Sequence, residues 1–195
     1  MNGTIESKPP SSWWRRQGPW LLGAALLGAY AFYMPYRESL NHYAIFHPIR
    51  PIEVAKGASA DYEGARWRLL NITQRDQRDL REDAMILVAR FELIADEGTS
   101  AKNLNRCKSR ISDARGRYWE VAPFSGLRVK SELPDSCGSG RGPNFTTIEP
   151  EPGKPWLFEQ AYLVPRGLDP KTLRPEIYMF SMEQRRPGDY LRFMP

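Results

Sequence analysis

Few residues in this sequence have side chains suited to catalysis or metal binding, and the two cysteines come first among them. Cys107 and Cys137 are the only cysteines among 195 residues. In an oxidising compartment they are predicted to form a disulfide, which closes a loop of about 30 residues and adds roughly 3–4 kcal/mol of stability. The alternative is a catalytic thiol, which needs a nearby base, and residues 61–195 contain no histidine. The sequence therefore favours the disulfide.

The two histidines do not form a recognisable metal site. His42 and His47 are five residues apart and have no cysteine or carboxylate cluster beside them. This spacing does not place them on one helical face, so we expect ordinary polar residues and predict no metal and no cofactor. The glycine-rich residues 139–142 lack the strand-to-helix setting that a phosphate-binding loop needs.

Paired carboxylates leave one catalytic alternative open. Asp76 with Asp79, or Glu149 with Glu151, could act as the acid and base of an envelope hydrolase. Such pairs are common on solvated loops, and no nucleophile–histidine arrangement accompanies them. We therefore predict a protein that is not an enzyme, with the hydrolase as the alternative.

The amino-terminal segment predicts a membrane location. Residues 19–36 contain no charge, and 18 helical residues span about 27 Å, close to the ~30 Å hydrocarbon core of a bilayer. Aromatic and basic side chains near both ends of this run are typical of the membrane–water interface. The interface residues are Trp13, Trp14, Arg15, Arg16, Trp20, Tyr33 and Tyr36.

The basic residues also predict the orientation of this span. Lys8, Arg15 and Arg16 precede the uncharged run, so a single-pass protein would keep its amino terminus in the cytoplasm and export the rest. The alternative is a signal peptide cleaved after Ala31, because Ala29 and Ala31 fit the small-residue rule for cleavage. Both interpretations place the carboxy-terminal domain outside the cytoplasm, at the cell membrane or beyond it.

The net charge of +5 is explained largely by the same segment. Residues 1–60 contribute +3 of it, and residues 61–195 contribute only +2, with both signs interspersed. No stripe of basic residues with interleaved aromatics is present, so we do not expect a nucleic-acid partner.

The chain is predicted to divide into four segments. These are a polar tail (1–18), the membrane helix (19–36), a proline-containing linker (37–60) and one domain (61–195). In the last segment apolar and polar residues alternate with period two, over short stretches separated by turn residues. This pattern predicts a mainly β, antiparallel, immunoglobulin-like β-sandwich. Its expected core residues are Trp67, Leu69, Leu87, Phe91, Leu93, Ile111, Trp119, Val121, Phe158 and Tyr162.

Strands are expected over residues 64–73, 85–95, 107–113, 117–122, 156–164 and 176–182, with short strands near 127–130 and 145–148. The apolar face changes phase between Leu69 and Leu70, which predicts a β-bulge. Asp113 and Gly116 occupy the first and last positions of a predicted type I turn that joins two strands.

The domain resembles a family of immunoglobulin-like domains of unknown function found on bacterial lipoproteins and membrane-anchored envelope proteins, in particular single-pass actinobacterial ones. The likeness covers about residues 61–183 and rests on an opening aromatic strand, a long apolar strand, a hairpin with a glycine turn and a strand ending in Val-Pro. The residues that carry it are Gly64 to Trp67, Met85 to Ala95, Asp113, Gly116, Trp119, Glu151 to Phe158, Val164 and Pro165. The resemblance implies a fold and an envelope location, and it supplies no catalytic residue. No cysteine follows the apolar segment, so a lipid anchor is not expected.

These observations predict a membrane-anchored module outside the cytoplasm that binds or scaffolds another envelope component. The candidate binding surfaces are the charged loop 75–83 and the cysteine-containing loop 131–144. A second alternative is an accessory subunit of a membrane complex, for which Ala24 and Gly28 supply a small-residue pair.

Overall fold

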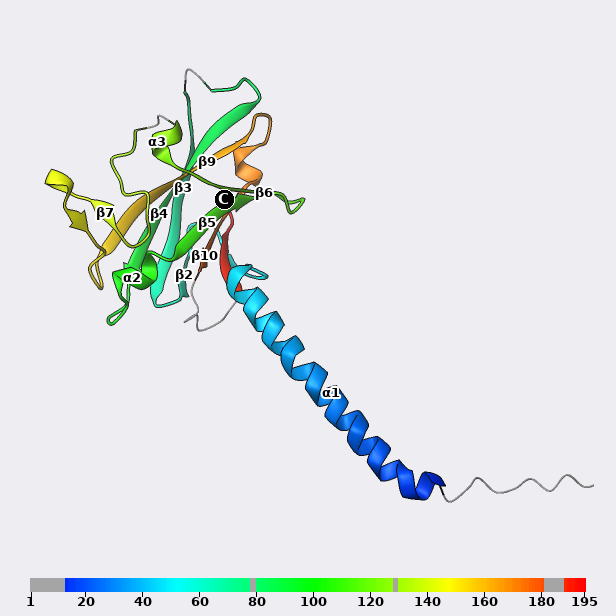
Figure 1. The fold of residues 1–195 in the computed structure, drawn as a ribbon. Helices are drawn as coiled ribbons and strands as arrows, with labels where there is room; N and C mark the ends of the chain where they lie inside the picture. The colour runs from blue at the N-terminus through cyan, green and yellow to red at the C-terminus, as the bar shows by residue number, and fades with distance from the viewer. Residues whose placement is uncertain (1–12, 78–79, 128–129, 181–187) are drawn as a thin grey trace, which may run out of the picture. The chain divides into compact units, whose positions relative to one another are not determined.

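The computed structural model describes residues 13–77, 80–127, 130–180 and 188–195 (Figure 1). The chain separates into two compact units, Met1–Tyr43 and Ala44–Pro195. One long helix, α1 (Trp13–Phe46), accounts for the described part of the first unit and enters the second. The second unit is built almost entirely from strands.

Helix α1 is longer than predicted. Pro19 and Pro35 both lie inside it, and the helix continues past Pro35 to Phe46. A proline removes one hydrogen bond from a helix but does not always end it. Within the part of the chain that the structure describes, no helix is both long and apolar enough to cross a membrane. The predicted span over residues 19–36 is therefore not supported, because two glycines, two prolines and three tyrosines make this uncharged run only moderately apolar.

The strands of the second unit form one continuous sheet. Its order is β1-β11-β10-β5-β6-β9-β4-β3-β2 among the described residues. The strands are β1 (Arg50–Val54), β2 (Ser59–Tyr62), β3 (Ala65–Arg75), β4 (Ala84–Ala95), β5 (Cys107–Ser112), β6 (Tyr118–Ala122), β9 (Pro155–Pro165), β10 (Arg174–Met179) and β11 (Asp189–Phe193). A small separate hairpin joins β7 (Gly140–Arg141) to β8 (Thr147–Ile148). The short helices are α2 (Ala101–Leu104), α3 (Phe124–Leu127), η1 (Pro143–Phe145) and η2 (Pro170–Thr172).

The sheet folds over on itself at β6. The first half of β6 pairs with β5, and its last two residues, Val121 and Ala122, pair with β9. Two layers therefore face each other, with β1, β11, β10 and β5 on one side and β9, β4, β3 and β2 on the other. The phenol of Tyr62, on the edge strand β2, donates to the Asp189 carbonyl of β11 at 2.8 Å, so the sheet nearly closes into a barrel.

The core lies between these layers. Trp67, Leu87, Phe91, Leu93, Ile111, Phe158 and Tyr162 are fully buried, as predicted, while Leu69, Trp119 and Val121 are only partly buried and pack at its margin. The rings of Phe91 and Phe158 stack with centroids 5.2 Å apart, and Trp67 meets Phe158 edge-on. This packing confirms a mainly β, sandwich-like fold.

Several predicted local features are present. The register of β3 and β4 shifts between Leu69 and Asn71, which places the predicted bulge at Leu70. Gly116 donates its backbone N–H to the Asp113 carbonyl at 3.1 Å with a φ of 79°, in the predicted turn between β5 and β6. The strands expected over residues 64–73, 85–95, 107–113, 117–122 and 156–164 begin and end within two residues of β3, β4, β5, β6 and β9. The strand expected over 176–182 corresponds to β10, which begins two residues earlier and ends at Met179, and residues 181–182 lie outside the described residues.

The structure differs from the prediction in the segment taken for a linker. Residues 37–60 contain the end of α1, all of β1 and the start of β2. Pro51 suggested a linker, but it lies in the edge strand β1, where a missing N–H donor is tolerated. Strand β1 runs parallel to β11, so the sheet is not wholly antiparallel, and the immunoglobulin-like arrangement stays a prediction.

The two short predicted strands are not confirmed over their full lengths. Residues 124–127 form helix α3, and residues 128–129 of the short strand expected at 127–130 lie outside the described residues. Of the strand expected at 145–148, only Thr147 and Ile148 are extended in β8. Strand β11 was not predicted, although it lies between β1 and β10 and completes the sheet.

Candidate functional site

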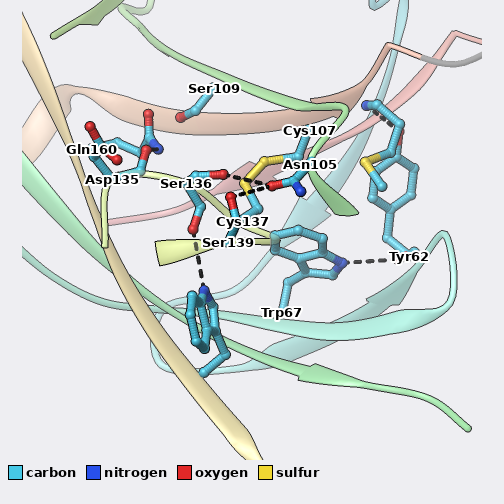
Figure 2. Close-up of a disulfide and its surroundings, with 12 residues drawn as sticks. Tyr62, Trp67, Asn105, Cys107, Ser109, Asp135, Ser136, Cys137, Ser139 and Gln160 are labelled. Carbon is cyan, nitrogen blue, oxygen red and sulfur yellow. Dashed lines mark hydrogen bonds between the residues drawn. A yellow bond between two sulfur atoms is a disulfide. The ribbon is translucent and has the colours of Figure 1, made fainter. Parts of the chain in front are cut away.

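The loop between β6 and β9 is tied to the rest of the domain by a disulfide (Figure 2). Cys107, the first residue of β5, is bonded to Cys137, with the two Cα atoms 6.3 Å apart. Cys137 is fully buried and belongs to the core cluster. The predicted disulfide is confirmed, and neither sulfur is a free thiol in this structure.

Two serines beside Cys137 hold the loop to the residue that follows α2. The hydroxyls of Ser136 and Ser139 donate to Asn105 Oδ1 at 3.0 and 2.9 Å (Figure 2). Gly138 lies between these serines, and a Cβ atom there would come within 2.5 Å of the Asn105 nitrogen and 2.6 Å of the Ala101 carbonyl oxygen. Only glycine permits this approach without a shift of the backbone.

The same loop is also held against β9. The Trp156 indole donates to the Ser136 carbonyl at 3.2 Å, and the Gln160 amide donates to the Asp135 carbonyl at 2.6 Å. The Glu159 backbone N–H donates to the Pro134 carbonyl at 2.8 Å. Residues 134–139 are therefore fixed by the disulfide and by five hydrogen bonds to residues of the β9 strand and the α2 end.

Glu159 organises the outer surface beside this loop. It lies on the side of β9 opposite to the core residues Phe158 and Tyr162, and it is only 3% exposed. Arg90 of β4 donates through Nε and Nη2 to Glu159 Oε1 at 3.0 and 2.7 Å, and the Ser131 hydroxyl donates to Oε2 at 2.8 Å. One carboxylate thus joins the loop to the sheet.

The two predicted binding surfaces meet at this carboxylate. Arg75, the last residue of β3 and the first of the charged loop, has its Nη2 atom 4.0 Å from Glu159 Oε1. Arg75 and the loop residues Ser131 and Glu132 line one hollow of about 520 Å³. We call it the loop hollow, and its remaining lining residues are Arg90, Lys130, Leu133, Leu157 and Glu159.

The loop hollow contains cations that are available to a ligand. Lys130 forms no ion pair or hydrogen bond within the described ranges, and Arg75 has only its long contact with Glu159. Arg90 is already engaged in two hydrogen bonds to Glu159. The hollow therefore combines a fixed ion pair at its base with a lysine and an arginine that can still bind an acceptor.

A second hollow lies beside the disulfide. It measures about 320 Å³ and is lined by polar side chains that include Lys108, Glu120 and Gln160. Ser109 also lines this hollow, and its hydroxyl is hydrogen-bonded to that of the buried Tyr162. Burial raises the pKa of Tyr162 well above its ordinary value, so this phenol stays protonated and does not act as a base near neutral pH.

A second buried carboxylate lies in the opposite layer. Glu176 of β10 is 0% exposed and accepts from Arg110 Nε at 2.5 Å, from Arg192 Nε at 2.8 Å and from the Ser112 hydroxyl at 2.7 Å. Three tyrosine rings surround the Arg110 guanidinium with their centroids 4.8–5.6 Å from Cζ; they belong to Tyr118, Tyr178 and Tyr190. Both carboxylate oxygens of Glu176 therefore accept hydrogen bonds.

The carboxylates considered for catalysis lie at exposed positions where the structure describes them. Glu149 and Glu151 are exposed, and Glu151 forms an ion pair with Lys154 at 2.5 Å. Asp76 is exposed, and Asp79 lies outside the described residues. No group of His, Cys, Asp and Glu side chains that could hold a metal ion occurs among the residues that the structure describes.

The predicted membrane-interface residues all lie on α1. Trp20, Tyr33 and Tyr36 are 79%, 57% and 64% exposed. Trp13, Trp14, Arg15 and Arg16 form the first turn of the helix, and their side chains lie outside the described residues. His42 also lies on α1, and His47 follows its end.

Comparisons with known proteins find similarity among solved structures. No family model matches the chain, and no curated protein matches it. Among solved structures, a secreted protein of Mycobacterium tuberculosis, MPT63, shares 15% identity with a TM-score of 0.42, over 74% of this chain and 98% of that chain. An uncharacterized β-sandwich protein of Clostridium difficile 630 shares 9% identity with a TM-score of 0.41, over 74% of this chain and 94% of its own. The description of the fold therefore rests on the strands of this chain itself.

The residues that build the loop hollow were not found from the sequence as a group. Neither Arg90 nor Glu159 is among the site residues predicted from the sequence. A charged residue at an outward position of an otherwise apolar strand is the available signal. It does not identify the partner, because Arg90 and Glu159 are 69 residues apart and meet only through the register of β4 and β9.

Proposed function

We propose that this chain is an exported β-sandwich module that binds or scaffolds an envelope component at the loop hollow and does not catalyse a reaction. The observation that carries the proposal is that both surfaces expected to bind a partner border one hollow. Arg75 comes from one surface and Ser131 from the other, and both contact Glu159. A binding site on fixed loops at one side of a rigid sheet is typical of sandwich domains.

The pre-formed geometry of the loop supports binding rather than catalysis. In the hollow, the Ser131 hydroxyl donates to Glu159 and accepts from the Leu133 backbone N–H, and the adjoining residues 134–139 are fixed by the disulfide and the hydrogen bonds described above, so little conformational entropy is lost when a partner docks. Glu159 accepts hydrogen bonds from Arg90 and Ser131, which suits it to position groups and not to transfer protons. Lys130 and Arg75 supply charge-assisted donors for an acceptor group of the partner.

Export and membrane association are part of this proposal. A disulfide between Cys107 and Cys137 fits an oxidising compartment outside the cytoplasm. Residues 19–36, with basic residues before them, would direct export and hold the chain at the membrane, because their apolar side chains on α1 are exposed. Membrane fractionation and maleimide labelling of an introduced surface cysteine in intact cells test this part, and a cytoplasmic domain would contradict it.

Site-specific photo-crosslinking in intact cells tests the binding site. A photoreactive residue placed at Glu132, in the loop hollow, should yield a discrete crosslinked species, and Arg75→Glu with Lys130→Glu should abolish it. The matched control carries the photoreactive residue at Lys154, which is exposed and lies outside the hollow. Equal crosslinking from both positions, or a species that is indifferent to the two charge reversals, would contradict binding at this site.

A further inference from the structure

A separate apolar groove lies beside the edge strands β1 and β2. It has a volume of about 350 Å³ and is formed by the turn between β1 and β2, the bulge of β3, helix η2 and the last residues of the chain. We call it the end groove, and its lining residues are Lys56, Gly57, Leu69, Leu70, Asn71, Ile72, Pro170, Lys171, Met194 and Pro195. This volume and the mostly apolar lining are in the range of small-molecule sites in proteins.

The floor of the end groove is a margin of the core that the chain leaves uncovered. Leu69 and Ile72 are partly buried and pack against the main core cluster. At the bulge Leu70 turns outward, and Leu70 and Met194 remain 38% and 37% exposed. These apolar side chains are continuous with the core and open to solvent, so covering them with an apolar ligand is energetically favourable.

Two lysines stand at the rim of this apolar floor. Lys56 comes from the turn between β1 and β2, where Gly57 has a φ of 73°, and Lys171 comes from η2. Neither lysine side chain forms an ion pair within the part of the chain that the structure describes. An apolar groove with two ammonium groups at its edge is complementary to a molecule that has an aliphatic chain and one anionic end.

We propose that the end groove binds a single aliphatic chain that ends in a carboxylate, as in a medium-chain fatty acid. The chain would cover Leu69, Leu70, Ile72 and Met194, while the carboxylate would accept from Lys56 and Lys171. A phosphate group would be better served by an arginine fork or by a free helix N-terminus. No arginine is among the described residues that line the groove. The first turn of η2 is already capped, since the Lys171 backbone N–H donates to the Asp169 carboxylate at 2.9 Å.

The proposal is tested on the full chain in phospholipid nanodiscs, with dodecanoate as the probe and methionine methyl groups as the NMR reporters. Met194 lines the groove, Met85 and Met179 are buried in the core, and Met34 lies on α1. Dodecanoate should shift the Met194 methyl signal in a saturable manner and leave those of Met85 and Met179 in place. A shift confined to Met34 would show binding to the helix alone and would overturn the proposal.

The role of the lysines is tested by comparing dodecanoate with dodecanol. Dodecanoate should bind the unchanged protein about tenfold more tightly than dodecanol, and Lys56→Gln with Lys171→Gln should remove that difference while leaving dodecanol binding unaltered. The matched control, Lys102→Gln with Lys154→Gln, removes two exposed charges elsewhere and should retain it. Equal affinity of the two probes for the unchanged protein would overturn the assignment.

The apolar floor is tested independently of charge. Leu70→Asn exchanges one half-exposed side chain at the bulge, so the fold should be kept, and binding of both probes should weaken severalfold. Tighter binding of dodecyl phosphate than of dodecanoate would contradict the carboxylate assignment. These outcomes do not depend on the loop hollow, whose lining shares no residue with the end groove.

Discussion

The two buried carboxylates occupy similar positions and have different surroundings. Glu159 lies in the β9 layer and Glu176 in the β10 layer, each on the side of its strand opposite to core residues, and each contacts two arginines and one serine. Around Glu176 both arginines lie within 2.8 Å and tyrosine rings cover the guanidinium of Arg110. Around Glu159 the second arginine is 4.0 Å away and a hollow remains open.

This difference separates a site that stabilises the fold from one that can bind a partner. A buried carboxylate without compensation is strongly destabilising, so both residues need their arginines. Both carboxylate oxygens of Glu176 accept hydrogen bonds from Arg110, Arg192 or Ser112, and tyrosine rings cover the Arg110 guanidinium. Glu159 is satisfied by Arg90 and Ser131, and Arg75 and Lys130 remain as donors at the edge of the hollow.

The largest expected effect comes from removing the disulfide. Replacing Cys107 and Cys137 together by serine should lower the free energy of unfolding by about 3.5 kcal/mol, because a closed loop of 30 residues is released. Urea denaturation measures the loss. The stability losses from removing the disulfide and from Glu159→Gln should not be additive, because the loop held by the disulfide also carries Ser131. The losses from removing the disulfide and from Glu176→Gln should be additive. Coupling to Glu176 instead would show that the two carboxylate sites are not separate.

Neutralising Glu176 should have the next largest effect. Glu176→Gln leaves Arg110 and Arg192 without their shared anion and should cost about 3 kcal/mol of unfolding free energy. Glu159→Gln should cost less, about 1–2 kcal/mol, because Arg75 and Arg90 are more exposed and can be hydrated. Glu132→Gln, at an exposed position, is the control. A larger loss for Glu159 than for Glu176 would reverse the comparison.

High pH should weaken the Glu176 side of the domain. Burial, with a smaller contribution from Glu120, raises the pKa of Tyr178 to about 12. Between the ordinary tyrosine pKa of about 10 and this value, the unfolded chain loses the proton while the folded chain keeps it, so stability falls as pH rises. The loss should be smaller than that from Glu176→Gln. Urea midpoints between pH 9 and pH 12 measure it, and Tyr178→Phe should flatten the decline; an unchanged slope would contradict this origin.

The smallest expected effect concerns Arg75. Its side chain is 43% exposed and contacts Glu159 at the longest distance of the cluster, so Arg75→Gln should change stability by no more than about 0.5 kcal/mol. The same substitution should reduce partner crosslinking at the loop hollow. Arg90→Gln, by contrast, should destabilise the domain by about 1–2 kcal/mol because it removes two hydrogen bonds to a buried carboxylate. Equal losses for the two arginines would show that Arg75 is a structural residue.

The local features of the domain could be predicted because they depend on neighbouring residues. The phase change at Leu70 revealed the bulge, and Asp113 with Gly116 revealed the turn between β5 and β6. The alternation of Met85 to Ala95 revealed β4 and most of its core positions. Strands β1 and β11 were missed because they are short and pair with each other across the length of the chain.

The amino-acid sequence by itself determined the mainly β character of the domain, most of its core and the two cysteines that form the disulfide. Period-two alternation and turn residues could be interpreted because they depend on neighbouring residues. The disulfide could be predicted because the chain contains only two cysteines. Only the tertiary structure decided that Arg90 and Glu159 are partners, that the loops around Arg75 and Ser131 share one hollow, and that Lys56 and Lys171 flank one groove. Those contacts join segments that are far apart in the chain, and the register of the sheet, which no local pattern encodes, brings them together.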